Sequence, residues 1–391
     1  MSRGTPAAAS PKPERLFIGN FLSAAGASRG VCEDLVERLR GAGWSVEAAS
    51  TKLPRMARLL DMAVAVWRGR RRVGIVHVDV FSGDAFLWAA VIVFMLRSLG
   101  KIHVLTLHGG SLPEFAARWP FAVRRTLSAA SVVTAPSEFL RREMRPYRSN
   151  LVLLPNPLDL SAYPYRQRER PEPRLVWLRA FHDTYNPSLA PRVLALVSRD
   201  YPGATLTMIG PDRGDGSLAR ARAQAADLGV LDRVQFAGQI PKASVGEHLS
   251  RGDIFLNTTN VDNAPVSVLE AMACGLCVVS TRVGGLSDLV RDGDEGLLVP
   301  PDDAEAMVAA IRRVLHEPEL AARLSAGGRL RARSMDWNTV LPQWEDLLIA
   351  ANAAAALEEG PLERSAAATF GRSHRGSSQV MMRPTAWFCG S

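Results

Sequence analysis

Residues 257–285 read NTTNVDNAPVSVLEAMACGLCVVSTRVGG, and the rest of the chain is organised around them. A polar loop that carries Asp262 leads into a short apolar helix, which we expect to begin near Ser267 and to hold Glu270 in its first turns. A glycine ends that helix, and the β-branched run at 277–280 is typical of a buried parallel strand. In a doubly wound sheet, ligands bind at the loops that follow the carboxyl ends of the strands. A loop of Asn, Thr and Asp before a helix N-terminus is therefore a candidate site for anions and hydroxyl groups.

The composition of the chain limits its class. At 391 residues it is too long for one ordinary core, so we expect two domains. The formal charge of +8 comes almost entirely from arginine, which suits anionic partners such as nucleotide phosphates or lipid head groups. A genomic base bias would produce the same arginine excess. The arginines are spread over helical segments without interleaved aromatic residues, which argues against a nucleic-acid binder.

The sequence predicts a protein of the reducing cytoplasm, free or at the inner face of the plasma membrane. The first twelve residues lack the apolar core of a signal peptide, and the most hydrophobic run, Ala85–Leu96, is shorter than the ~20 residues that span a bilayer. The four cysteines are too few for a disulfide framework in a chain of this size. Cys274 and Cys277 have C-x-x-C spacing but no second pair or nearby histidine, so we expect packing residues there rather than a zinc site. We expect no metal site in the chain.

The first half of the chain alternates strands and helices. A strand at 15–19 is followed by a loop containing Gly26 and by a helix at 29–40, which together begin a βαβ unit. That loop is not a G-x-G-x-x-G, so its phosphate signal is weak by itself. His108 directly follows a strand at 102–107 and so lies on the ligand side of the predicted sheet, where we favour a functional role over a structural one.

Residues 54–72 predict an amphipathic helix with a strongly basic end, and two interpretations remain open. Such a helix can lie on an anionic membrane surface. The alternative is an ordinary packed helix whose basic end is solvated.

The second half repeats the alternation, and its motifs resemble a known family. The run DNAPVSVLEAMACGLCVVSTRVGGLSDLV at 262–290, followed by DGDEGLLVPPDDAEAM at 292–307, is similar to the C-terminal signature of family 4 retaining glycosyltransferases, which have the GT-B fold. HGG at 108–110 and LRAFHDTYNP at 178–187 agree with that family. The resemblance extends over about residues 16–348.

The resemblance implies roles for four charged residues. Of the family's two acidic residues spaced E-x7-E, Glu270 would hold the ribose hydroxyls of the nucleotide, and Asp262, which is shorter than the usual Glu, would contact the transferred sugar. Arg179 matches the arginine that binds the diphosphate. The lysine that usually accompanies it falls near 184–185, where this chain has Thr-Tyr, and Lys242 is the candidate replacement.

The same resemblance assigns the remaining site residues. His108 would lie beside the donor sugar, and Gly26 would be part of the turn that faces the pyrophosphate. The backbone N–H groups of Val266 and Ser267 would face the diphosphate at the start of a helix. We expect no cofactor, because the UDP- or GDP-sugar is a substrate.

The predicted architecture is α/β with the GT-B arrangement, two Rossmann-like doubly wound domains that face each other across a cleft. We expect an acceptor-binding domain at 14–165 and a nucleotide-sugar-binding domain at 166–335. A helix at 336–358 should cross back onto the N-terminal domain, and residues 359–391 should form a disordered tail.

The predicted function is transfer of a sugar from the nucleotide to a glycan, a lipid-linked molecule or another envelope acceptor, with retention at the anomeric carbon. The resemblance implies a same-face displacement rather than a carboxylate nucleophile. Two other functions remain open, a sugar-nucleotide 2-epimerase of the same fold and a non-catalytic sugar-nucleotide binding protein. The basic helix at 54–72 adds an anionic membrane as a possible peripheral partner.

Overall fold

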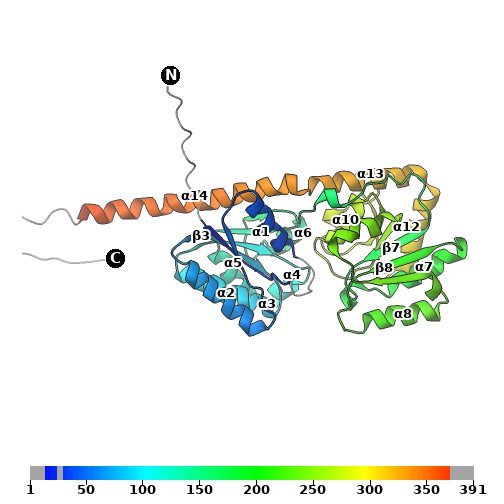
Figure 1. Cartoon of the computed structure of the whole chain (residues 1–391), viewed down its shortest axis with the longest axis horizontal. Helices are drawn as coiled ribbons and strands as arrows, with labels where there is room; N and C mark the ends of the chain where they lie inside the picture. Colours follow the sequence, from blue (N-terminus) through cyan, green and yellow to red (C-terminus); the bar gives the residue numbers. More distant parts are fainter. Residues whose placement is uncertain (1–13, 24–29, 370–391) are drawn as a thin grey trace, which may run out of the picture.

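The computed structural model describes residues 14–23 and 30–369, with side chains as far as residue 353. It has two α/β lobes that lie side by side, joined by the connection 154–173 and by a long last helix (Figure 1). Each lobe contains a parallel sheet with six strands and helices on both faces. The two doubly wound domains of the sequence prediction are therefore confirmed.

The N-terminal sheet has the strand order β2-β1-β3-β4-β5-β6. Its strands are β1 (Glu14–Ile18), β2 (Val46–Ala49), β3 (Val73–Val80), β4 (Ile102–Leu107), β5 (Val132–Ala135) and β6 (Leu151–Leu153). Its helices are α1 (Val31–Gly41), α2 (Arg55–Gly69), α3 (Asp84–Ser98), α4 (Leu112–Arg118), α5 (Pro120–Ala129) and α6 (Glu138–Met144). Helices α2, α3, α5 and α6 share one apolar core with the sheet, and α1 packs in the other.

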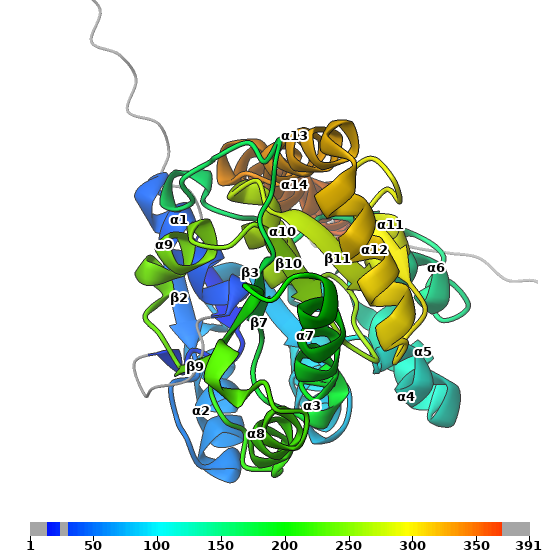
Figure 2. The ribbon, with the colours of Figure 1, turned by 90° about the vertical axis from the view of Figure 1, so that its right-hand side faces the viewer.

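The C-terminal sheet has the strand order β12-β11-β10-β7-β8-β9. Its strands are β7 (Arg174–Leu178), β8 (Thr205–Ile209), β9 (Val234–Gly238), β10 (Ile254–Asn257), β11 (Cys277–Thr281) and β12 (Leu297–Val299). Its helices are α7 (Leu189–Asp200), α8 (Ser217–Asp227), α9 (Val245–Ser250), α10 (Val266–Ala273), α11 (Leu286–Leu289), α12 (Ala304–His316) and α13 (Pro318–Ser334), all labelled in Figure 2. Because the chain winds outward in both directions from β7 and β10, the loops after these two strands diverge and leave a crevice between them.

The last helix, α14 (Trp337–Thr369), leaves the C-terminal lobe and runs along the N-terminal one (Figure 1). Trp337, Val340, Trp344 and Leu348 enter the same apolar core as α1 and the N-terminal sheet, which confirms the predicted return of the chain. The helix continues past 358, where we expected it to stop and a disordered tail to begin. Alanine, which dominates 351–356 and 366–368, favours a helix without needing a packed face, and our prediction gave that propensity too little weight. The rest of the predicted tail, 370–391, lies outside the described residues.

Two smaller points complete the comparison with the sequence. Cys274 and Cys277 are buried free thiols in apolar clusters, as expected for packing residues. Burial raises the pKa of each thiol to about 12, so both stay protonated. Over residues 14–23 and 30–369, no helix combines the length and the apolar character needed to cross a membrane.

Candidate active site

The loop after β10 and helix α10 place the two predicted carboxylates at the carboxyl edge of the C-terminal sheet. Asp262 lies in the loop, and Glu270 lies in the second turn of α10, which begins at Val266 after the N-cap residue Pro265. The turn after β11 packs directly against that loop. A Cβ atom at Gly284 or Gly285 would overlap the carbonyl oxygen of Asp262 or of the next residue, so only glycine permits this approach.

A cavity of about 460 Å³ opens in front of α10, between it and the loops that follow β7, β8 and β9. Its lining includes Arg179 after β7, Lys242 after β9, and Ser267 and Glu270 from α10. Ser23 of the N-terminal lobe also reaches it. The volume lies within the range of pockets that hold small ligands and cofactors.

Two ion pairs cross this region. Arg179 pairs with Asp262 across the crevice between β7 and β10, and Lys242 pairs with Glu270. The guanidinium of Arg179 also lies 4.2 Å from the ring centroid of Tyr185, a stacking contact that restricts its position. Burial raises the pKa of Asp262, and the charge of Arg179 opposes that rise. Each predicted carboxylate of the site therefore has a cation beside it.

Two buried polar atoms at the cavity have no hydrogen-bond partner among the residues that the structure describes. They are Nε of Arg179 and the hydroxyl oxygen of Ser267. Unpaired buried donors are costly in a folded protein, so such atoms indicate a place where a ligand completes the hydrogen bonds. The first N–H groups of α10, at Val266 and Ser267, also lack an intrahelical acceptor because of their position. All these donors favour an anion with several oxygens.

His108 comes from the facing lobe, directly after β4. Its Nε2 is 2.8 Å from Oδ1 of Asp79, which lies near the end of β3, and its ring stacks on Phe81 with centroids 4.7 Å apart. Burial acts to raise the pKa of Asp79, but the charge and hydrogen bond of His108 outweigh it and leave that pKa below its usual value. A charged carboxylate thus holds Nε2 of the His108 imidazole, and Phe81 covers one face of the ring.

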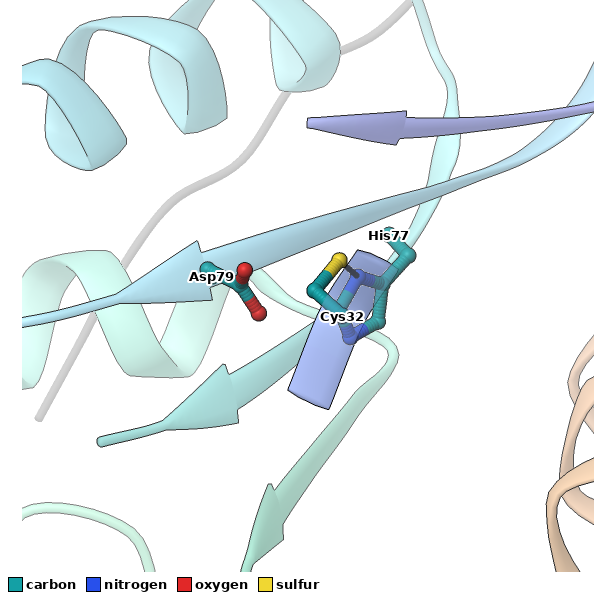
Figure 3. A group of neighbouring side chains, drawn as sticks. All are labelled: Cys32, His77 and Asp79. Atoms are coloured by element: carbon teal, nitrogen blue, oxygen red, sulfur yellow. Dashed lines mark hydrogen bonds between the residues drawn. The ribbon is translucent and has the colours of Figure 1, made fainter. Parts of the chain in front are cut away.

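Asp79 also lies beside Cys32 and His77, a group whose ligand atoms are all within 4.8 Å of one another (Figure 3). Among the described residues this is the one cluster with metal-ligand spacing. The contacts of these three residues fit a hydrogen-bond network better than a metal site. Sγ of Cys32 lies 4.0 Å from Nδ1 of His77, and Asp79 already binds His108. The other ring nitrogen of His77 lies 2.7 Å from the hydroxyl of Thr106.

A second cavity, of about 390 Å³, lies between the lobes. It is lined on one side by Gly110 and Ser111, just after His108, and on the other by Arg213, Tyr185 and Asp262. Tyr185 and Arg213 also line the first cavity, so the two spaces share a wall. The site therefore has one chamber within the C-terminal lobe and a neighbouring one at the junction of the lobes.

The structure brings most of the predicted site residues into one region. Arg179, Lys242, Val266, Ser267 and Glu270 line the first cavity, Asp262 lines the second, and His108 lies just ahead of the second cavity's N-terminal wall. Gly26 falls outside the described residues.

The sequence analysis missed four residues that complete this region. They are Asp79, Tyr163, Tyr185 and Arg213. Asp79 had a usable signal, because it lies at the carboxyl end of β3, and Tyr185 had a weaker one, because it lies in the loop after β7. Tyr163 had none, because it belongs to the connection between the lobes and reaches Glu270 only in the folded chain.

Comparison with known proteins was consistent with this arrangement. The family described as Glycosyltransferase Family 4 matches residues 26–162, and the one described as Glycosyl transferases group 1 matches residues 166–331. The two matches cover the two lobes in turn.

Individual relatives are distant. A D-inositol 3-phosphate glycosyltransferase of Geodermatophilus obscurus is 29% identical over 85% of this chain and 77% of its own length. One of Acidothermus cellulolyticus is 28% identical over 65% of this chain and 60% of its own length, so the chain spans less than two thirds of that relative. Among solved structures, sucrose-phosphate synthase from Thermosynechococcus elongatus superposes with a TM-score of 0.73 at 21% identity, covering 88% of this chain and all of that one.

Proposed function

Because the chain belongs to the family 4 glycosyltransferases of the GT-B fold, we propose that it transfers a sugar from a nucleotide-sugar donor to a hydroxyl acceptor, with retention at the anomeric carbon. One observation carries the proposal. Arg179, Lys242, Glu270 and the unpartnered hydroxyl of Ser267 converge on a cavity of about 460 Å³ at the carboxyl edge of a parallel sheet, and a second carboxylate, Asp262, pairs with Arg179 in the adjoining cavity. A nucleoside diphosphate has ribose hydroxyls for carboxylates and phosphate oxygens for cations and N–H donors.

In this proposal the donor takes over groups that pair with one another in the structure, Arg179 with Asp262 and Lys242 with Glu270. Glu270 accepts hydrogen bonds from the ribose hydroxyls. Arg179, Lys242 and the first N–H groups of α10, at Val266 and Ser267, bind the diphosphate. The hydroxyl of Ser267 and Nε of Arg179, which have no partner among the described residues, then obtain acceptors. Lys242, already in contact with Glu270, serves as the second cation that Thr184 and Tyr185 cannot supply.

The chemical step requires stabilisation of the negative charge that grows on the leaving diphosphate. A fixed guanidinium and the positive end of a helix supply it within a partly water-excluded cavity. The bond between the anomeric carbon and the diphosphate oxygen breaks, a bond to the acceptor oxygen forms on the same face, and the acceptor proton passes to the departing phosphate. Asp262 and His108, from opposite lobes, orient the sugar. None of these roles requires a metal ion.

The test is release of nucleoside diphosphate from UDP- and GDP-sugars with a panel of acceptors. The panel includes D-inositol 3-phosphate, because the relatives described above are named for it, and lipid-linked glycans. Nucleoside diphosphate that appears only with an acceptor supports transfer. An isomerised donor would indicate the 2-epimerase, which the transferase names of the relatives do not favour, and binding without turnover would indicate a binding protein.

We also propose an anionic membrane as the surface at which the acceptor is met, on the cytoplasmic side. The two neighbouring helices α2 and α3 bury one face against the sheet and leave a second apolar face in solvent. Its members are Met56, Leu60, Val64 and Trp67 on α2, and Leu87, Val91 and Phe94 on α3. The basic residues Arg55, Arg68, Arg70 and Arg71 belong to α2 or follow it directly. An amphipathic surface of this kind favours anionic bilayers.

Vesicle sedimentation tests the membrane proposal. The protein should sediment with phosphatidylglycerol vesicles and not with phosphatidylcholine vesicles, and the double variant Leu60→Ser/Trp67→Ser should bind at least tenfold more weakly. Leu330→Ser is the matched control, because Leu330 is equally exposed but lies on α13. Equal binding of all three proteins would overturn the proposal.

A further inference from the structure

The connection between the lobes is fastened to the C-terminal lobe along most of its length. Its Leu158 exchanges backbone hydrogen bonds with Met335 and Trp337, at 2.8 and 3.1 Å. Glycine at Gly246 allows the connection to approach closely, because a Cβ atom there would overlap the carbonyl oxygen of Ala162. This part of the connection is therefore held against the lobe that contains the 460 Å³ cavity, although Asp159 also pairs with Arg38 of α1.

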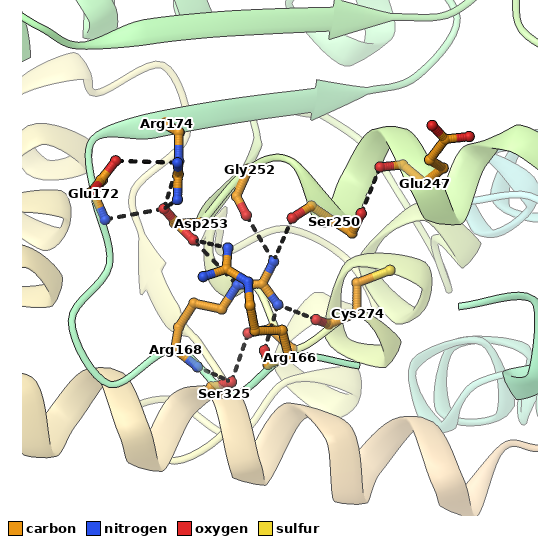
Figure 4. A network of polar contacts seen from close by, with 11 residues as sticks. Arg166, Arg168, Glu172, Arg174, Glu247, Ser250, Gly252, Asp253, Cys274 and Ser325 are labelled. Carbon is orange, nitrogen blue, oxygen red and sulfur yellow. Dashed lines mark hydrogen bonds and ion pairs between the residues drawn. The ribbon is translucent and has the colours of Figure 1, made fainter. Parts of the chain in front are cut away.

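A buried polar network fixes the second part of the same connection (Figure 4). Arg168 is almost completely buried, and its guanidinium donates to Asp253 and to the carbonyl oxygens of Ser250, Gly252 and Cys274. Asp253 in turn accepts from two other arginines of the connection and the start of β7. A fully satisfied network of this kind allows few alternative positions for the backbone.

Tyr163 lies between these two fastened segments. Its ring is 4% exposed and packs in the same apolar cluster as Leu158, Val245 and Leu249. Its hydroxyl donates a hydrogen bond of 2.7 Å to Oε1 of Glu270. Burial and the neighbouring carboxylate raise the pKa of the Tyr163 phenol, so it remains a donor at any physiological pH.

The two oxygens of Glu270 are used unequally. Oε1 accepts from both Tyr163 and Lys242. Oε2 has no partner among the residues that the structure describes. The long side chain of Lys242 is 54% exposed and free to turn, whereas the side chain of Tyr163 is fixed by packing. A carboxylate turns easily about its last torsion, so a rigid donor on one oxygen determines where the other one lies.

We propose that Tyr163 is a positioning residue that holds Glu270 with Oε2 available to the nucleotide's ribose, and so makes the enzyme discriminate ribonucleotides from deoxyribonucleotides. The inference rests on the proposed function and adds to it a specificity element from outside the two sheets. When the diphosphate attracts Lys242, Tyr163 stays as the one rigid donor to Oε1. A site built to bind a hydroxyl rejects an analogue without it only if the carboxylate is held in place.

The test is calorimetric binding of UDP, GDP and their 2′-deoxy and 3′-deoxy forms to the full chain. For the nucleotide that binds, we expect the wild type to prefer the ribose form by about 100-fold, because the deoxy form loses a hydrogen bond to a charged group. In Tyr163→Phe the affinity for the ribose form should fall about tenfold while that for the deoxy forms stays unchanged, because a hydrogen bond to a charged group is lost. Tyr165→Phe is the matched control, since Tyr165 lies two residues further along the same connection and is 40% exposed, against 4% for Tyr163.

Each outcome separates the inference from the proposal beneath it. If neither UDP nor GDP binds the wild type, the proposed function fails, and with it this inference. If the wild type binds ribose and deoxy forms equally, Glu270 is not the ribose anchor and Tyr163 has no such role. If the wild type discriminates and Tyr163→Phe discriminates equally well, the Tyr163 inference alone is overturned. A parallel loss for both forms would show a merely structural role and would overturn it too.

Discussion

Removing Arg179 separates its structural contact from its proposed contact with the diphosphate. Its guanidinium pairs with Asp262, whose side chain is only 11% exposed. In Arg179→Ala that carboxylate stays buried without a cation. Breaking a buried pair in this way costs about 3–5 kcal/mol, and because the cavity admits water we expect a loss of about 3 kcal/mol in the free energy of unfolding. The double variant Arg179→Ala/Asp262→Asn should recover most of it, because neither charge remains.

The effect on turnover should not be recovered in the double variant. Loss of one preorganised group that stabilises a developing anion typically costs about 10²–10³-fold in rate. We therefore expect kcat/KM to fall by that factor from wild type to Arg179→Ala. The same factor should separate Asp262→Asn from the double variant, because the diphosphate still lacks its cation.

The assay is a cycle of four proteins, each measured by urea unfolding and by acceptor-dependent release of nucleoside diphosphate. Arg192→Ala is the control, because Arg192 forms a largely exposed pair with Asp302, and such pairs contribute at most about 1 kcal/mol. Equal kcat/KM in Asp262→Asn and in the double variant would refute the reasoning. Arg179 would then act only as the partner of Asp262.

Three further predictions concern groups around the site. Asp79→Asn removes the charge that faces His108, so we expect about tenfold lower kcat with a little-changed KM for the donor in the same turnover assay. Burial lowers the pKa of His77 to about 4, so the unfolded chain binds the extra proton between that value and about 6.5, and stability falls as the pH falls through this window. Urea unfolding should show a loss of about 2 kcal/mol from pH 7 to pH 5 that is absent in His77→Asn. Asp253→Ala leaves the guanidinium of Arg168 buried without its anion and should destabilise the protein by about 3–5 kcal/mol in the same unfolding assay.

Each of these predictions has a result that contradicts it. For Asp79, the contrary result is full turnover by the Asn variant, which would mean that His108 needs no fixed orientation. For His77, it is the same pH dependence in the variant as in the wild type. For Asp253, a loss below about 1 kcal/mol would mean that water reaches the buried network.

Much of the architecture followed from local patterns in the chain. The β-branched run at 277–280 became part of the buried parallel strand β11, because a strand covered on both faces is largely apolar. The three short helices α4, α5 and α6 were not anticipated, because each is only seven to ten residues long and gives little periodicity to recognise. The basic helix at 54–72 was left with two interpretations, since its pattern does not show which apolar face meets the core.

Part of the site could also be predicted from the sequence alone. Glu270, Asp262 and the start of α10 could be identified from one continuous stretch, 257–285, because loop, helix and strand follow one another there. Arg179 and His108 could be placed on the ligand side because each follows a strand. The sequence by itself therefore determined the sheets, the loops that carry ligand groups and the family of the chain.

Only the tertiary structure decided which charges meet. It paired Arg179 with Asp262 and Lys242 with Glu270, and it set Asp79 against His108. It also brought Tyr163, 107 positions away in the chain, within 2.7 Å of Glu270. The physical reason is that hydrophobic periodicity reports only which side of each segment is buried. These contacts depend on how segments far apart in the sequence are packed together, and no local pattern encodes the distance between their side chains.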